Sequence, residues 1–367
     1  MSEIAPSTWM ALCGLVCGLM LGFAGRYGRF CTLGMLEDSF FSNDRRRLRA
    51  FALALAISIA GTQSLSALGI IHLNGSIYLS SSFSVVSAVV GGLLFGVGMA
   101  LVGTCGYGTL VRIGGGDLRA IVGFLVMGVS AMAAMSGITG VLRVRFMDPL
   151  ALTLPKGYTF SLGDMGKLAF GQNWHNLIAG LIVLALAVWV LKSRAFRASP
   201  KLVLSATLVG VAIVLGWLAS SVFGSDPFEP IAPVSSTFVA PLGNSLLYLM
   251  TYSGSTITFG VGSVAGVILG SFLVATATRQ FRWEACDDPR ELKRHMIGSM
   301  MMGTGGILSV GCTVGQGLSA ASTLAISAPI VMFAISLGAR FGLELTMTGE
   351  WLPAFRNSLL IYRGTAE

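Results

Sequence analysis

The segment 103-GTCGYGTL-110 has an outline that occurs three times in this chain of 367 residues. The other two copies are 30-FCTLGML-36 and 311-GCTVGQGL-318, and each stands beside a long apolar segment. In every copy a cysteine is followed three residues later by a glycine. The chain has only six cysteines, so three of them in one local setting indicate a shared role. The pairs are Cys31 with Gly34, Cys105 with Gly108, and Cys312 with Gly315.

The composition of the chain is that of a membrane protein. Hydrophobic residues make up 54% of it, charged residues make up 11%, and the mean hydropathy is +0.79. A soluble globular chain is about one quarter charged, and a membrane span needs about 20 mostly apolar residues. We therefore predict an all-α integral membrane protein with about nine transmembrane helices in one domain, residues 1–367. The predicted spans are 9–25, 50–71, 84–102, 119–139, 175–191, 202–222, 257–277, 296–310 and 325–345.

The basic residues predict an orientation in the membrane. The net charge of +8 would also suit a nucleic-acid-binding protein, but basic residues beside apolar spans mark cytoplasmic loops. Arginines and lysines follow the first, third, fifth and seventh spans, whereas the loops 72–83 and 223–256 contain none. This pattern places the N-terminus outside and the C-terminus, with Arg356 and Arg363, inside. The loop 140–174 departs from it, because it carries four basic residues on the outer side.

Glycines repeat at matching distances in two parts of the chain. The matched residues are Gly91, Gly96, Gly98, Cys105 and Gly108 in one part, and Gly298, Gly303, Gly305, Cys312 and Gly315 in the other. The charge pattern makes the span before Cys105 run inward and the span before Cys312 run outward, which is typical of inverted-repeat transporters. We predict repeat one over about 9–140, repeat two over about 256–346, and added helices and loops over about 141–255.

A second glycine pattern lies ahead of each copy. Gly14, Gly18 and Gly22 are spaced by four residues, as are Gly262, Gly266 and Gly270. Glycines at this interval make a helix face on which another membrane helix can approach closely. We interpret these two ladders as a further pair of corresponding segments.

The cysteine segments themselves are too rich in glycine to be full spans. Backbone that is not helical is tolerated at membrane depth only where protein or a wet cavity satisfies its N–H and C=O groups. We expect the segments around Cys105 and Cys312 to be re-entrant loops that enter from opposite faces, each opening into a short helix. The proline-containing segment 223–254 is expected to be an outer loop or a short re-entrant piece.

The residues near Cys31, Cys105 and Cys312 in the sequence limit the roles that these cysteines can have. Cys13, Cys17 and Cys286 are interpreted as ordinary packing or loop residues. The histidines His72, His175 and His295 stand at no metal-ligand spacing from a cysteine, and no base for nucleophilic catalysis lies near one. We therefore expect no metal, no cofactor and no enzymatic activity. A thiol is a weak hydrogen-bond donor and a soft group, which suits a soft sulfur-containing anion whose charge is met by backbone N–H groups.

The chain resembles the YeeE/YedE family of sulfur transporters. The resemblance lies in the Cys-x-x-Gly settings, in 26-RYGRFC-31 and in 281-FRWE-284, and it is weakest across 140–256. It implies inverted halves with an hourglass profile and uptake of thiosulfate across the plasma membrane. It implies also that Cys31, Cys105 and Cys312 pass thiosulfate onward through S–H···S hydrogen bonds, and that a TusA-like sulfur-carrier protein is a cytoplasmic partner.

Three other interpretations remain open, one of which is a plain channel for small solutes whose cysteines only fill space. In another, the chain is a membrane sulfurtransferase or thiol oxidoreductase, and a cysteine forms a persulfide. In the third, the cargo is another reduced sulfur or selenium species. The residues alone indicate a soft sulfur-containing anion, and only the resemblance specifies thiosulfate.

Overall fold

The structure, a computed structural model, describes residues 6–42, 44–73, 75–155, 158–170, 175–224, 232–285 and 288–350. Cys286, Arg356 and Arg363 lie outside the described residues.

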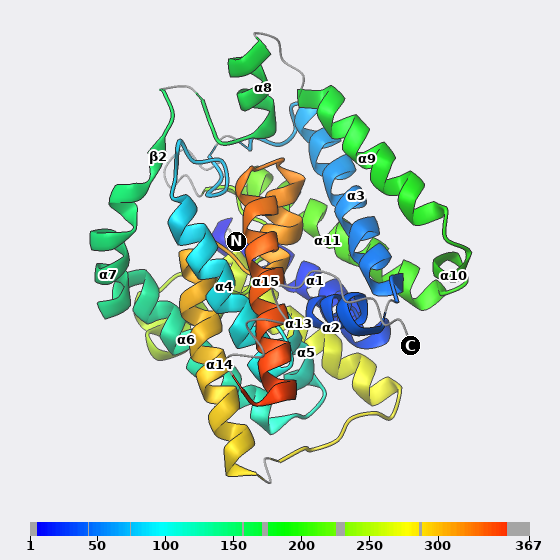
Figure 1. The fold of residues 1–367 in the computed structure, drawn as a ribbon, viewed down its shortest axis with the longest axis vertical. Helices are drawn as coiled ribbons and strands as arrows, with labels where there is room; N and C mark the ends of the chain where they lie inside the picture. Colours follow the sequence, from blue (N-terminus) through cyan, green and yellow to red (C-terminus); the bar gives the residue numbers. More distant parts are fainter. Residues whose placement is uncertain are drawn as a thin grey trace, which may run out of the picture.

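The described part is a bundle of helices with one small antiparallel ribbon, in which β1 (Ser82–Phe83) pairs with β2 (Leu152–Thr153) (Figure 1). The α-helices are α1 (Pro6–Tyr27), α2 (Thr32–Glu37), α3 (Arg46–Ala67), α4 (Val85–Val102), α5 (Gly106–Gly114), α6 (Leu118–Ser136), α7 (Ile138–Phe146), α8 (Leu162–Phe170), α9 (His175–Leu191), α10 (Arg194–Arg197), α11 (Pro200–Phe223), α12 (Val239–Met250), α13 (Phe259–Ala277), α14 (Pro289–Leu308) and α15 (Ser327–Thr348). The π-helices are η1 (Asp38–Ser42) and η4 (Gly315–Ala320), and the 3-10 helices are η2 (Asp148–Leu150) and η3 (Tyr252–Gly254).

Seven segments of the described chain are long and apolar enough to cross a membrane, rather than the predicted nine. They are α1, α3, α4 together with α5, α6, α11, α13 and α15. The predicted span 175–191 is present as α9, a helix of only 17 residues. The predicted span 296–310 lies mostly within α14, which begins with the charged stretch 290-RELKR-294 and is therefore not among the seven. The multi-span membrane class is confirmed, and seven of the nine predicted spans are helices long and apolar enough to cross a membrane.

The two glycine ladders pack against each other in one close contact, between α1 and α13. On α1, a Cβ atom at Gly18 would lie 2.9 Å from Cα of Gly266 on α13, and a Cβ at Gly22 would lie 2.8 Å from the backbone N of Ser271. Gly14 meets Phe259 and Gly22 meets Val267, so contacts advance along both helices together. The helices α1 and α13 therefore run in the same direction. Inverted counterparts would run in opposite directions, so this pair of ladders reflects close packing and gives no support to an inverted repeat.

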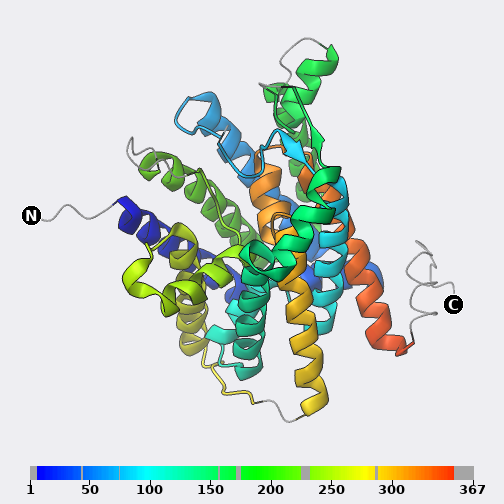
Figure 2. The ribbon, with the colours of Figure 1, turned by 90° about the vertical axis from the view of Figure 1, so that its left-hand side faces the viewer.

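The helices α4 and α14 make the opposite kind of contact. A Cβ atom at Gly91 would lie 2.7 Å from the carbonyl oxygen of Gly305, and one at Gly98 would lie 2.5 Å from that of Gly298. The reciprocal contacts, Gly305 to Gly91 and Gly298 to Gly98, are equally short at 2.7 and 2.8 Å. Because the order of contacts reverses, these helices are antiparallel. Figure 2 shows α4, α14 and α15 side by side, and α15 packs on α4 through Gly92, Gly96 and Gly338.

Connecting segments lie at two opposite ends of the helix bundle. The ribbon β1–β2 and helix α8 lie at one end, and the connection from α13 to α14 lies at the other (Figure 1). Between the ends, the short segments α2, α5 and η4 are packed among the long helices. All residues of η4 and most residues of α5 are buried. These short segments carry the cysteines singled out by the sequence.

Candidate functional site

Each of the three cysteines stands immediately before a short helical segment and bonds into it. The Sγ atom of Cys31 accepts a hydrogen bond from the backbone N–H of Gly34 at 3.5 Å, and Cys105 accepts one from Gly108 at 3.5 Å. Cys312 accepts one from Gly315 at 3.4 Å. A side chain that caps a helix bonds the N–H two or three residues ahead. The Cys-x-x-Gly spacing is thus the spacing of a cysteine cap, and Cys31 and Cys105 are the caps of α2 and α5.

The glycine in each motif leaves room for a polar neighbour. A Cβ atom at Gly34 would collide with the guanidinium of Arg47, and one at Gly108 would collide with the hydroxyl of Thr104. At Gly315 it would lie 2.6 Å from Oγ1 of Thr237 and 3.2 Å from the hydroxyl of Tyr78. A side chain at any of the three positions would therefore displace a polar group beside the cysteine.

The fold brings the three cysteines together from distant parts of the chain. The hydroxyls of Thr32 and Thr313, the residues that follow Cys31 and Cys312, share a hydrogen bond of 3.1 Å. Cys105 is an electrostatic neighbour of both Cys31 and Cys312. All five cysteines in the described part are free thiols. The group of Cys31, Cys105 and Cys312 is called the cysteine group below.

The cysteine group differs in burial from one member to the next. The side chains of Cys105 and Cys312 have exposed fractions of 0% and 1%, whereas Cys31 is partly exposed. Cys13 and Cys17 lie apart from the group on α1, where Cys17 packs with Met10 and Phe259 and Cys13 borders an apolar groove with Trp9. Their apolar surroundings agree with a packing role.

Around Cys312 the structure places hydroxyl groups that the sequence did not mark. Tyr78, from the connection between α3 and α4, is 5% exposed and is an electrostatic neighbour of Cys312. Its hydroxyl lies beside that of Thr237 but has no hydrogen-bond partner of good geometry. The buried hydroxyl of Ser236 also lacks a partner. No spacing in the sequence connects Tyr78 with Cys312, because the contact depends on how a loop folds back over η4.

Around Cys31 the surroundings are cationic instead. A cavity of about 420 Å³ is lined by Cys31, by Thr104 and Gly108 of the neighbouring motif, and by four arginines. These arginines are Arg26, Arg29, Arg47 and Arg112. A larger cavity of about 580 Å³ shares Arg26, Arg29 and Arg47 with the first, and adds Asp38, Asp44, Arg46 and Lys201. We call the first of these the arginine cavity.

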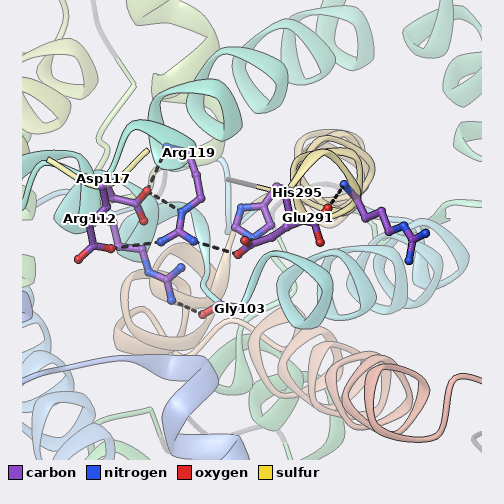
Figure 3. A network of polar contacts seen from close by, with 9 residues as sticks. Gly103, Arg112, Asp117, Arg119, Glu291 and His295 are labelled. Carbon is purple, nitrogen blue, oxygen red and sulfur yellow. Dashed lines mark hydrogen bonds and ion pairs between the residues drawn. The ribbon is translucent and has the colours of Figure 1, made fainter. Parts of the chain in front are cut away.

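A network of ion pairs lies beside Arg112 of this cavity (Figure 3). Arg119 contacts Asp117 at 3.1 Å, Glu284 at 3.2 Å and Glu291 at 3.0 Å. The backbone joins the same segments, because Leu118 N–H donates to the Glu284 carbonyl at 3.0 Å and Glu284 N–H donates to the Gly116 carbonyl at 3.1 Å. The network ties the start of α6 to the connection between α13 and α14.

The fold and the site together define a multi-span membrane protein with a group of three free thiols, two of which are buried. Its sequence matches the family model described as "Sulphur transport" over residues 27–341, and the chain belongs to that family. Two relatives are thiosulfate transporters named TsuA. The one from Escherichia coli (strain K12) is 28% identical over 84% of this chain and 87% of its own length. The one from Spirochaeta thermophila is 25% identical over 89% of this chain and 96% of its own length.

The family match confirms the resemblance proposed from the sequence. The repeated motif, the glycine-rich first helix and 281-FRWE-284 identified a family of sulfur transporters, and the matched region contains all three members of the cysteine group. The chain is thus a member of a transporter family, and the specific cargo and route are taken up next.

Proposed function

We propose that this chain is a plasma-membrane importer of thiosulfate, and that Cys31, Cys105 and Cys312 hand the anion onward through S–H···S hydrogen bonds. One observation carries the proposal. Three segments that are far apart in the chain place a cysteine in the same capping geometry and converge on one buried region. Two relatives that share most of their length with this chain are named thiosulfate transporters, which supports the choice of cargo.

The thiols suit this cargo on chemical grounds. A buried, uncharged thiol neither repels an anion nor binds a hard oxygen tightly. The terminal sulfur of thiosulfate is soft, so exchanging one sulfur contact for the next costs little. Gly34, Gly108 and Gly315 keep the polar neighbours of the cysteines in place, and so support the route without binding the cargo through a side chain.

The proposal includes a topology in which repeat one (about 9–140) and repeat two (about 256–346) are inverted, with 141–255 as the connecting helices and loops. The reciprocal glycine contacts between α4 and α14 support it, because a two-fold relation produces paired contacts of this kind. A further point is that Gly103 and Val310, which correspond in the glycine alignment, both adopt positive φ, at 75° and 56°. The cysteine segments would then be re-entrant, with the N-terminus outside and the C-terminus inside.

Cysteine variants test the function directly. Purified protein is reconstituted into liposomes, and uptake of labelled thiosulfate is measured with sulfate as competitor. Cys31→Ala, Cys105→Ala and Cys312→Ala should each abolish uptake and growth on thiosulfate as sole sulfur source, whereas Cys13→Ala should leave both unchanged. Wild-type uptake by all three variants would overturn the proposal.

Mass spectrometry after exposure to thiosulfate distinguishes this importer from a sulfurtransferase. A transporter that uses hydrogen bonds forms no obligatory covalent adduct, whereas a sulfurtransferase accumulates a persulfide on one cysteine. A stoichiometric adduct on any of the three residues would favour the enzyme. A TusA-like sulfur carrier on the cytoplasmic side is the proposed acceptor of the imported sulfur.

A further inference from the structure

We infer that the arginine cavity is a binding site for a tetrahedral oxyanion, and that it holds the sulfonate end of the cargo while Cys31 contacts the terminal sulfur. The inference rests on the proposed function for the identity of the cargo. The site itself is argued from the charges, contacts and volume around Cys31.

The cavity has positive charge and no compensating carboxylate in its wall. Its lining contains four guanidinium groups, from Arg26, Arg29, Arg47 and Arg112, and no aspartate or glutamate. Guanidinium groups bind tetrahedral and planar oxyanions through paired, charge-assisted hydrogen bonds. Arg47 is paired with Asp38, which lies outside the lining. Among the described residues no carboxylate forms an ion pair with Arg26, Arg29 or Arg112, so an anion in the cavity would meet positive charge that a neutral solute would leave unmatched.

Three of the arginines are held in place by contacts that leave other N–H groups free for a ligand. The Nε atom of Arg47 pairs with Asp38 at 3.3 Å, while its NH1 group lies beside Gly34. One NH2 group of Arg26 donates to the Gln280 carbonyl at 3.0 Å, and that of Arg112 donates to the Gly103 carbonyl at 2.8 Å (Figure 3). A guanidinium has five N–H donors, so each of these three arginines has further N–H groups that can bind a ligand.

One of these further N–H groups, on Arg26, is buried and has no hydrogen-bond partner. The Nε atom of Arg26 has no hydrogen-bond acceptor in the structure. A buried donor of a charged group that lacks an acceptor costs free energy, and an oxyanion in the adjoining cavity would supply the missing acceptor. This observation points to a ligand independently of the charge count.

The position of the cavity connects it with the cysteine group. Cys31 and Gly108 both line it, so an anion held by the arginines lies against the Cys31 thiol and beside the motif of Cys105. The volume of about 420 Å³ falls in the range of small-molecule sites. Thiosulfate has one soft and one hard end, and this cavity offers a soft group and hard cations side by side.

The two ends of thiosulfate should bind different groups: the oxygens bind the arginines and the terminal sulfur contacts the Cys31 thiol. Sulfate has the oxygens but no terminal sulfur, so it should bind the arginines and ignore the thiol. Binding of thiosulfate and of sulfate to the detergent-solubilised full chain is therefore measured by isothermal titration calorimetry. The variants are Arg47→Gln, Arg47→Lys, Arg29→Gln and Cys31→Ala. Arg46→Gln is the matched control, because Arg46 is an arginine of the larger cavity that does not line the arginine cavity.

The expected pattern has three parts. Arg47→Gln and Arg29→Gln should weaken the binding of both anions about tenfold, which is the usual loss for one charge-assisted hydrogen bond. Arg47→Lys should lose less, because it keeps the charge. Cys31→Ala should weaken thiosulfate binding and leave sulfate binding unchanged, and Arg46→Gln should change neither.

Two results would overturn the site. The first is wild-type affinity for both anions in folded Arg47→Gln and Arg29→Gln protein. The second is an equal loss with Arg46→Gln, which would mean that only the general positive charge matters. Failure of the proposed function looks different: the wild type would transport no thiosulfate, yet sulfate binding would still fall with Arg47→Gln, and the oxyanion site would stand.

Discussion

The two ends of the cysteine group are built from different chemistry. Cys31 is partly exposed and borders a cavity lined by four arginines. Cys312 is 1% exposed, Tyr78 lies near it, and the hydroxyls of Tyr78 and Thr237 lie beside Gly315 of the same motif. An anion beside Cys31 would exchange water for guanidinium groups. An anion beside Cys312 would exchange it for neutral donors and backbone N–H groups. The difference indicates that the route is not chemically symmetric, even if the backbone around it is repeated.

Neutral donors at the Cys312 end should bind a passing anion more weakly than the arginines do. Full positive charges hold an anion tightly, while hydroxyl groups stabilise it less and release it more readily. Under the proposed function, the Cys312 end would dehydrate the anion and select for its shape, and the arginine end would collect it. The following predictions test this division, beginning with the largest expected effect.

Thiol labelling should separate the two ends most strongly. In variants that keep only one member of the cysteine group, a negatively charged methanethiosulfonate should modify Cys31 at least ten times faster than Cys105 or Cys312, because the latter two side chains are fully buried. The negatively charged reagent should also react with Cys31 faster than a cationic one of the same size, because of the arginines. Equal rates at Cys31 and Cys312 would remove the distinction drawn here.

A methyl group at Gly315 should damage the Cys312 end. In Gly315→Ala the new Cβ would lie 2.6 Å from Oγ1 of Thr237 and 3.2 Å from the hydroxyl of Tyr78. Overpacking of this kind costs about 1–3 kcal/mol, and we expect at least a tenfold loss of thiosulfate uptake with a lower unfolding temperature. The control is Gly180→Ala on α9, where a Cβ meets nothing within 4 Å, and where alanine favours the helix. Unchanged uptake by Gly315→Ala would show that the site tolerates displacement of both hydroxyls.

Part of the fold and of the site could be predicted from the sequence, and part could not. The membrane class, the family and the cysteine caps were all predictable, because each depends on local composition or spacing: a cap requires only Cys31 and Gly34 at the right interval. Seven of the nine predicted spans are long apolar helices. The other two are α9, which is short, and α14, which combines a charged start with an apolar end. The ladders that contain Gly18 and Gly266 were predicted as helix faces for close approach and as corresponding segments. The close approach is confirmed, whereas the parallel direction of α1 and α13 could not be predicted from the spacing of the glycines.

Contacts made by loops lay beyond the sequence for a physical reason. Tyr78 reaches Cys312 only after the loop between α3 and α4 has folded over η4. Arg47 reaches Gly34 only because the chain turns back between α2 and α3, so that these two helices pack together. Neither residue stands at a periodic position relative to a cysteine. The basic residues near Cys31 were visible, but they were interpreted as an orientation signal, and their convergence on a cavity depends on the tertiary fold.

Removal of the Tyr78 hydroxyl should have a moderate effect on transport and little effect on stability. In Tyr78→Phe the lost group has no hydrogen-bond partner of good geometry in the structure, so the free energy of unfolding should be unchanged or slightly higher. Under the proposed function this hydroxyl binds the cargo, and the KM for thiosulfate should rise about three- to tenfold, the value of one hydrogen bond. The ring should still pack on Trp217, 6.3 Å away between centroids. A large fall in stability with an unchanged KM would assign Tyr78 a structural role only.

The smallest effect is expected at the outer wall of the larger cavity, where Arg46 contacts Asp44 at 2.7 Å. Hydrogen bonding to Arg46 lowers the pKa of Asp44 below its usual value, so the pair contributes stability above the unfolded pKa of about 4 and loses it as pH falls through the folded pKa. Asp44→Asn should lower the free energy of unfolding only slightly, because Arg46 is exposed and solvent screens the pair. Between pH 5 and pH 7 both pKa values lie below the range, so the difference in unfolding temperature between variant and wild type should stay constant, and KM should change less than twofold. A difference that grows across this range, or a large change in KM, would mean that Arg46 belongs with the arginines beside Cys31, and that the boundary between the two cavities is drawn in the wrong place.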